Sequence, residues 1–104
     1  MIPPAYYDVM VNTSQNLNLS YGYLMWLNGK ASAMEPGLQT VVNQFLTPSA
    51  PADMFAAMGK NGQLINVVPS QGLVVIRMGD APDTASVSLT LQEDLWKELN
   101  KVIP

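Results

Sequence analysis

Residues 65–77 read INVVPSQGLVVIR, and this stretch decides the fold that the sequence predicts. It holds the end of an extended stretch over Met54–Val68, which is interrupted at Gly59–Gly62, and a second run over Leu73–Met78. Runs rich in Val and Ile favour strands. The residues between the two runs, Pro69–Gly72, are typical of a tight turn, so we expect an antiparallel hairpin.

A third strand is expected upstream, over Tyr21–Leu27, which reads YGYLMWL. The run is apolar at successive positions, as is typical of a strand covered on both faces. Asn28-Gly29 follows and signals a turn. Residues 30–52 show weak periodicity and contain three prolines, so we expect them to form a long loop.

Two helices are expected to flank these strands. Pro3-Pro4 suits a helix start, and a short helix is predicted over residues 5–12. The C-terminal helix has a start signal, because Thr90 and Glu93 have the spacing of a capping box. Its apolar stripe comprises Leu91, Leu95, Leu99 and Val102, widened by Trp96 and Ile103.

These elements predict a single α+β domain over residues 1–104. We expect a three-stranded antiparallel sheet, with the C-terminal amphipathic helix packed on one face and a short N-terminal helix beside it. A chain of 104 residues is long enough for one domain. Its charged fraction is 12%, against about 25% in typical soluble domains, which favours a piece of a larger protein or an oligomer.

The composition excludes several classes of function. The net charge is −3 and no basic stripe occurs, so we expect no nucleic-acid binding. No apolar run approaches the length of a membrane span, and no signal peptide is visible. The chain has no cysteine and no histidine, which removes disulfides, thiolate chemistry, a Ser-His-Asp triad and His-based metal sites. We therefore expect no metal and no cofactor.

Three segments, in chain order, carry a resemblance to a known family. They are Tyr21–Leu27 (YGYLMWL), Phe55–Gln63 (FAAMGKNGQ) and the hairpin of residues 65–79. The chain is similar here to the C-terminal part of the β-lactamase-related serine hydrolases, which include class C β-lactamases, D-alanyl-D-alanine peptidases and esterases. The resemblance implies a partial β-lactamase-like fold. It also implies a parent enzyme, periplasmic or secreted, that cleaves an amide or ester through an acyl-enzyme on serine.

The resemblance also shows what is missing. The family's nucleophile motif is S-x-x-K, and no serine of this chain has a lysine three residues later. No Y-x-N occurs, and Ser14-Gln15-Asn16 matches S-x-N only within a polar turn at a helix end. We therefore expect no catalytic residue in this chain and no activity of the chain alone. The expected partner is the missing N-terminal part of the parent hydrolase.

The segment that could carry chemistry is Lys60-Asn61-Gly62-Gln63. The resemblance aligns it with the family's third motif. Lys60 would then attract a substrate carboxylate, Asn61 would replace the usual threonine, Gly62 would permit close approach, and the Gln63 N–H would help form an oxyanion hole. The same four residues are also good turn chemistry between two strands, and both interpretations stay open.

A second hypothesis from another class is a stand-alone binding or self-association module. It is motivated by the low charge content and by sheet edges that the predicted elements leave open. Tyr21, Tyr23 and Trp26 are expected in the core of their strand. Arg77 is expected to snorkel or to pair with an acid, and Asp80 and Asp83 have too few partners for a metal site.

Overall fold

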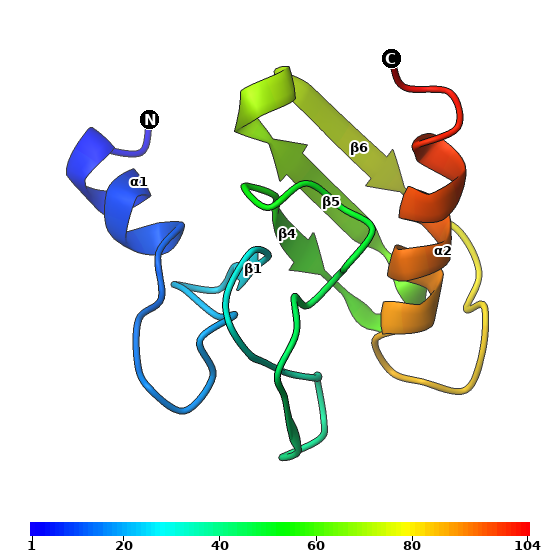
Figure 1. The fold of residues 1–104 in the computed structure, drawn as a ribbon, viewed down its shortest axis with the longest axis horizontal. Helices are drawn as coiled ribbons and strands as arrows, with labels where there is room; N and C mark the ends of the chain where they lie inside the picture. The colour runs from blue at the N-terminus through cyan, green and yellow to red at the C-terminus, as the bar shows by residue number, and fades with distance from the viewer.

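The computed structural model describes all residues, 1–104. It contains two helices and two separate antiparallel sheets (Figure 1). The helices are α1 (Pro4–Met10) and α2 (Leu89–Leu99). The main sheet has the order β1-β4-β5-β6, with bounds β1 Trp26–Leu27, β4 Phe55–Met58, β5 Leu64–Val68 and β6 Leu73–Arg77. The second sheet pairs β2 (Ala33–Met34) with β3 (Val41–Val42).

This architecture confirms the α+β class and the short N-terminal helix, and it corrects the strand count. Three strands were expected, whereas the main sheet has four and a two-stranded hairpin stands beside it. The difference arises in two places. The extended stretch over Met54–Val68 is split into β4 and β5 by a 3₁₀ turn at Lys60–Gly62, and the expected loop over residues 30–52 contains β2 and β3.

The β5–β6 hairpin forms as the sequence predicts. Its register runs without a bulge from Leu64↔Arg77 to Val68↔Leu73. The connection is a 3₁₀ turn over Pro69–Gln71, and Gly72 leaves it with φ +57°, a conformation that glycine adopts without steric cost. Directly paired residues share a face, so the two strands present one set of side chains to each side of the sheet.

The helix α2 covers one face of this sheet, which we call the inner face. Trp96 of α2 is fully buried in a cluster with Val68 of β5 and with Ala50 and Met54. Leu73, Val75, Leu99 and Ile103 pack against this cluster. In Figure 1, α2 lies at one side of the molecule and α1 at the other. The predicted packing of the C-terminal helix on one face of the sheet is thus present.

The start of α2 corrects the predicted capping box. The helix begins at Leu89, so Thr90 lies inside its first turn, and the N-cap is Ser88, whose Oγ accepts from the Leu91 N–H at 3.1 Å. The Glu93 carboxylate instead accepts from the N–H and the hydroxyl of Ser49. Glu93 therefore ties α2 to the loop before β4.

A reciprocal pair of amides lies at the centre of the helix–sheet interface. Asn66 of β5 and Gln92 of α2 are both fully buried. The Asn66 Nδ2 donates to Gln92 Oε1 at 3.0 Å, and the Gln92 Nε2 donates to Asn66 Oδ1 at 2.6 Å. The predicted stripe was centred on leucines, but the deepest residues of α2 are Gln92 and Trp96, whereas Val102 lies beyond the helix and is exposed.

The segment Tyr21–Leu27 is not the doubly buried strand that was predicted. It folds back on itself, with a bridge between Tyr21 and Trp26 and a bond from the Gly22 N–H to the Met25 carbonyl at 2.9 Å. Only Trp26–Leu27 joins the sheet. The backbone at Gly22 packs against the end of α1, where a Cβ would lie 2.1 Å from the Met10 carbonyl oxygen, so only glycine can pack there.

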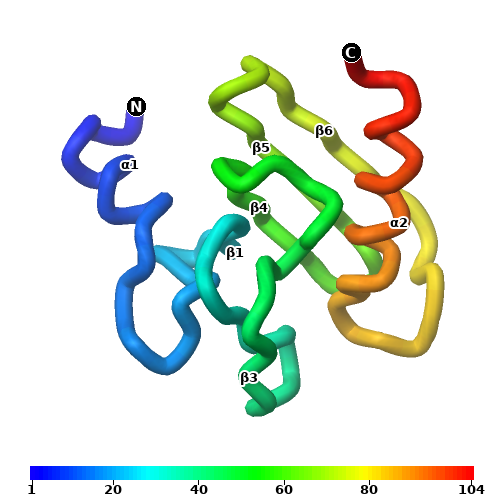
Figure 2. The backbone as a smooth tube through the Cα atoms, viewed as in Figure 1, coloured from blue at the N-terminus to red at the C-terminus, as the bar shows by residue number.

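One buried side chain helps to order the long segment that was predicted as a loop. The Asn28 Nδ2 donates to the carbonyls of Thr47, Ala50 and Pro51 at 3.0–3.2 Å, and its Oδ1 accepts from the Thr47 N–H at 2.9 Å. Figure 2 shows this segment looping away from the sheet through β3 and back to β4. Regular structure is scarce there, and side-chain hydrogen bonds anchor the segment instead: those of Asn28, the bonds of Asn18 to Met34, and the bonds of Glu93 to Ser49. No helix in the chain has the length and apolar character that a bilayer crossing requires.

The buried amide pair yields a test of the helix–sheet interface. Gln92→Leu is expected to lower the free energy of unfolding by about 2 kcal/mol, because the Asn66 amide is left buried without a partner. The double variant Asn66→Leu/Gln92→Leu should recover most of that loss. Glu98→Leu, on the exposed side of α2, serves as the control. Urea denaturation checks this, and a Gln92→Leu variant as stable as the parent would contradict it.

Candidate functional site

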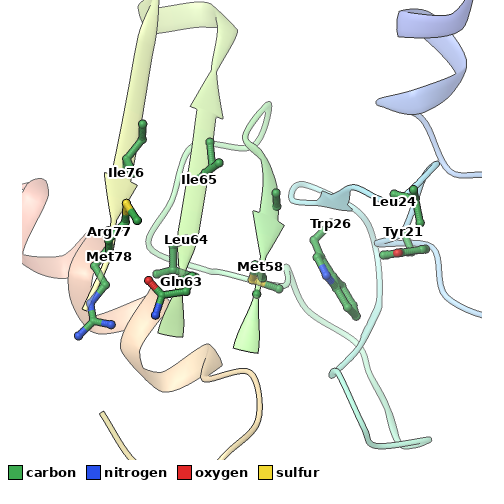
Figure 3. Close-up of a pocket in the computed structure, with 12 residues that line it drawn as sticks. Tyr21, Leu24, Trp26, Met58, Gln63, Leu64, Ile65, Ile76, Arg77 and Met78 are labelled. Carbon is green, nitrogen blue, oxygen red and sulfur yellow. The ribbon is translucent and has the colours of Figure 1, made fainter. Parts of the chain in front are cut away.

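A pocket of about 400 Å³ lies at the end of the sheet near the 3₁₀ turn Lys60–Gly62. It is lined by residues of all three segments that carry the family resemblance (Figure 3). The lining residues are Tyr21, Leu24 and Trp26 of the first, Ala57, Met58, Gly59 and Gln63 of the second, and Leu64, Ile65, Ile76, Arg77 and Met78 around the hairpin. Its size lies within the range of small-molecule sites.

One end of the pocket is aromatic. The rings of Tyr21 and Trp26 meet edge to face, with centroids 4.8 Å apart. Leu24 stands at the turn between them with φ +59° and is 79% exposed. A leucine in the left-handed region costs roughly 1–2 kcal/mol, and its apolar side chain gains little burial in return. The turn therefore holds an apolar side chain at the rim of the pocket at the expense of stability.

The other end of the pocket is polar and rigid. The Gln63 side chain spans two strand ends, because its Nε2 donates to the Gly79 carbonyl at 2.6 Å and its Oε1 accepts from the Gly79 N–H at 3.1 Å. The Arg77 Nη1 donates to the carbonyls of Gly62 at 3.1 Å and Asp80 at 2.9 Å. These bonds fix the guanidinium beside the pocket without neutralising it.

The four residues predicted as a site from the third motif do not all lie at the pocket. Lys60, Asn61 and Gly62 form the 3₁₀ turn between β4 and β5, and only Gln63 lines the pocket. Asn61 has φ +62° and Gly62 has φ +78°, as the turn interpretation requires. Lys60 is exposed and forms no ion pair. The local structure is thus a turn, placed at the border of the pocket.

Three residues that the sequence placed elsewhere belong to the site. Tyr21 and Trp26 were expected in the core, but they are half-buried and line the pocket. Arg77 was expected to snorkel or to pair with an acid, and it contacts backbone carbonyls instead. A signal for the aromatic residues was present in Gly22, which favours a turn over a strand at that point.

The site contains no group suited to metal binding or to nucleophilic attack. No three acidic, His or Cys residues are arranged to hold a metal ion. The lining residues include no serine, threonine, cysteine or lysine.

Comparison with protein-family models, curated proteins and solved structures found no match to this chain. What the geometry defines is an apolar, partly aromatic pocket with one cation, Arg77, among its lining residues.

The strained turn gives a prediction for stability. Leu24→Asn is expected to raise the free energy of unfolding by about 1 kcal/mol, because asparagine tolerates positive φ better than leucine does. Leu17→Asn is the matched control, since Leu17 is 82% exposed and does not have positive φ. Chemical denaturation of both variants measures the difference. Equal effects of the two substitutions would show that the turn at Leu24 stores no strain.

Proposed function

We propose that this chain is the non-catalytic, C-terminal part of a β-lactamase-like serine hydrolase and forms one wall of its substrate pocket. The observation that supports this best is that the three family-like segments, the first of them 27 residues upstream of the other two, line a single pocket. Their order alone carried the resemblance in the sequence. Because all three segments line the same pocket, we infer that they share one role, which is to contact a bound molecule.

The role of the chain in that enzyme is binding, because the pocket lacks the means for chemistry. The only polar side chains that line it are those of Tyr21, Gln63 and Arg77. An activated nucleophile needs a hydroxyl or thiol beside a base, and none of these three supplies such a pair. The serine and its lysine would therefore come from the upstream part of the parent.

The exposed apolar residues on the outer face of the sheet, opposite α2, are a second observation in favour of a larger parent protein. Ile65, Val74 and Ile76 lie on this face and are 46–61% exposed. Adjacent apolar side chains on one sheet face are usually covered by another layer. In the proposed parent, the part that carries the nucleophile would cover this face and close the pocket from that side.

This proposal predicts that the purified chain hydrolyses neither nitrocefin nor p-nitrophenyl butyrate above the buffer rate. The coding sequence upstream of Met1 is expected to contain S-x-x-K and Y-x-N in frame. Co-expression of that upstream part with this chain should restore hydrolysis, and Trp26→Ala should lower kcat/KM about tenfold through lost apolar contact, while Lys101→Ala leaves it unchanged. Hydrolysis by the chain alone that survives Lys60→Ala would contradict the proposal.

The second candidate, a self-association module, is favoured by a different observation. The sheet ends at β6, whose outer edge has no strand partner, and its side chains Val74 and Ile76 are exposed. An unprotected edge of five residues can pair with a second copy across a two-fold axis.

Sedimentation velocity tests this candidate. It predicts a concentration-dependent dimer that Ile76→Lys converts to monomer, because a charge on the exposed face of an edge strand opposes pairing. Thr90→Lys, on the exposed side of α2, adds the same charge and should not change the association. A chain that stays monomeric at all concentrations would contradict self-association and would leave the hydrolase proposal unaffected.

A further inference from the structure

We propose that the pocket binds an amphiphilic anion, with the Arg77 guanidinium holding an anionic group such as a carboxylate and the Tyr21–Trp26 pair contacting an apolar body. This inference concerns the same pocket as the proposed function and names the class of molecule that it takes. It needs no nucleophile, so it holds for the chain alone.

The charge of the pocket is the first step. Arg77 is the only ionised side chain that lines it, and the chain's three ion pairs all involve Lys97 or Lys101. The partners of Arg77 are carbonyls, which bear no formal charge. An arginine beside apolar surface without a carboxylate partner leaves a positive potential that an anion would neutralise.

The position of the guanidinium is the second step. Nη1 is held by the Gly62 and Asp80 carbonyls, whereas Nε and Nη2 make no hydrogen bond. The guanidinium lies in a close-packed corner, because a Cβ at Gly62 would lie 3.0 Å from Nη1, from Leu91 Cδ2 and from Pro82 Cδ. One nitrogen thus fixes the group, and two nitrogens keep donors available, which is the pattern that bidentate recognition of a carboxylate requires.

The third step is the apolar body. Nine of the twelve lining residues are hydrophobic. Figure 3 shows Arg77 at one end of the pocket and Trp26 and Tyr21 at the other, with Met58 and Gln63 between them. A ligand that satisfies both ends carries its charge at one end and an apolar or aromatic group at the other. A neutral apolar molecule would fill the pocket but leave the cation unpaired.

This assignment moves the anion-binding role from Lys60 to Arg77. Lys60 lies in the exposed turn and does not line the pocket. An exposed ammonium contributes little directed binding energy because water screens it. The two cations are therefore the competing candidates for contact with an anionic ligand, and substitution distinguishes them.

The experiment compares two fluorescent probes with nearly the same aromatic body, 8-anilinonaphthalene-1-sulfonate, which is anionic, and N-phenyl-1-naphthylamine, which is neutral. Arg77→Gln is expected to weaken binding of the anionic probe at least tenfold and to change binding of the neutral probe less than twofold. Lys60→Gln and Lys101→Gln remove the same charge and should change neither. Trp26→Ala should weaken both probes.

Three results would overturn the inference. The first is that Arg77→Gln binds the anionic probe as tightly as the parent chain does. The second is that Arg77→Gln, with a circular dichroism spectrum like that of the parent, loses affinity for both probes equally. The third is that Lys60→Gln, and not Arg77→Gln, weakens binding of the anionic probe. If Arg77→Gln does not fold, the salt dependence of probe binding by the parent chain tests the inference instead. Its affinity for the anionic probe must fall with added NaCl while that for the neutral probe does not. Failure to restore hydrolysis by co-expression would overturn the proposed function without changing these binding results.

Discussion

The structure depends above all on the fixed position of α2 against the inner face of the sheet. Asn66 and Gln92 bond to each other in full burial, so any shift of helix or strand leaves two amides without partners. A shift of one residue along β5 would also bring Ile65 to the inner face. This constraint assigns every side chain of the hairpin to one side, and it keeps the outer face available for other contacts.

The parts of the fold that the sequence predicted are those set by local pattern. The hairpin around Pro69–Gly72 and the helix over 89–99 follow from the spacing of apolar and turn residues, which acts over a few positions. The buried pair of Asn66 and Gln92 was not predicted, because a glutamine beside the apolar stripe of a helix is expected to face solvent. Its burial depends on a partner 26 residues away, and no local pattern encodes that distance.

The candidate site was predicted less well than the fold, for a related reason. The run Tyr21–Leu27 has the composition of a strand, yet the contact of Gly22 with the Met10 carbonyl turns it back. Gly22 favours a turn at this point, but leucine at position 24 argues against a left-handed residue, so the two signals conflict. Lys60–Gln63 had two open interpretations, and the structure gives these residues the local form of a turn. The Arg77 guanidinium is held by the carbonyl of Gly62, which lies in the turn between β4 and β5, so its position depends on a contact between residues that are distant in the sequence.

The helix–sheet interface and the pocket divide stability from binding. On the inner face, Trp96 is fully buried and the polar groups of Asn66 and Gln92 are paired, so that side supplies the cooperative core. On the outer face, Ile65, Val74 and Ile76 are exposed, and at the pocket Arg77 has no ion-pair partner and Leu24 is strained. Groups that cost stability and gain nothing within the chain gain something when another molecule meets them. Apart from Leu24, whose replacement relieves backbone strain, substitutions at the pocket should therefore change binding more than stability, and substitutions under α2 should do the reverse.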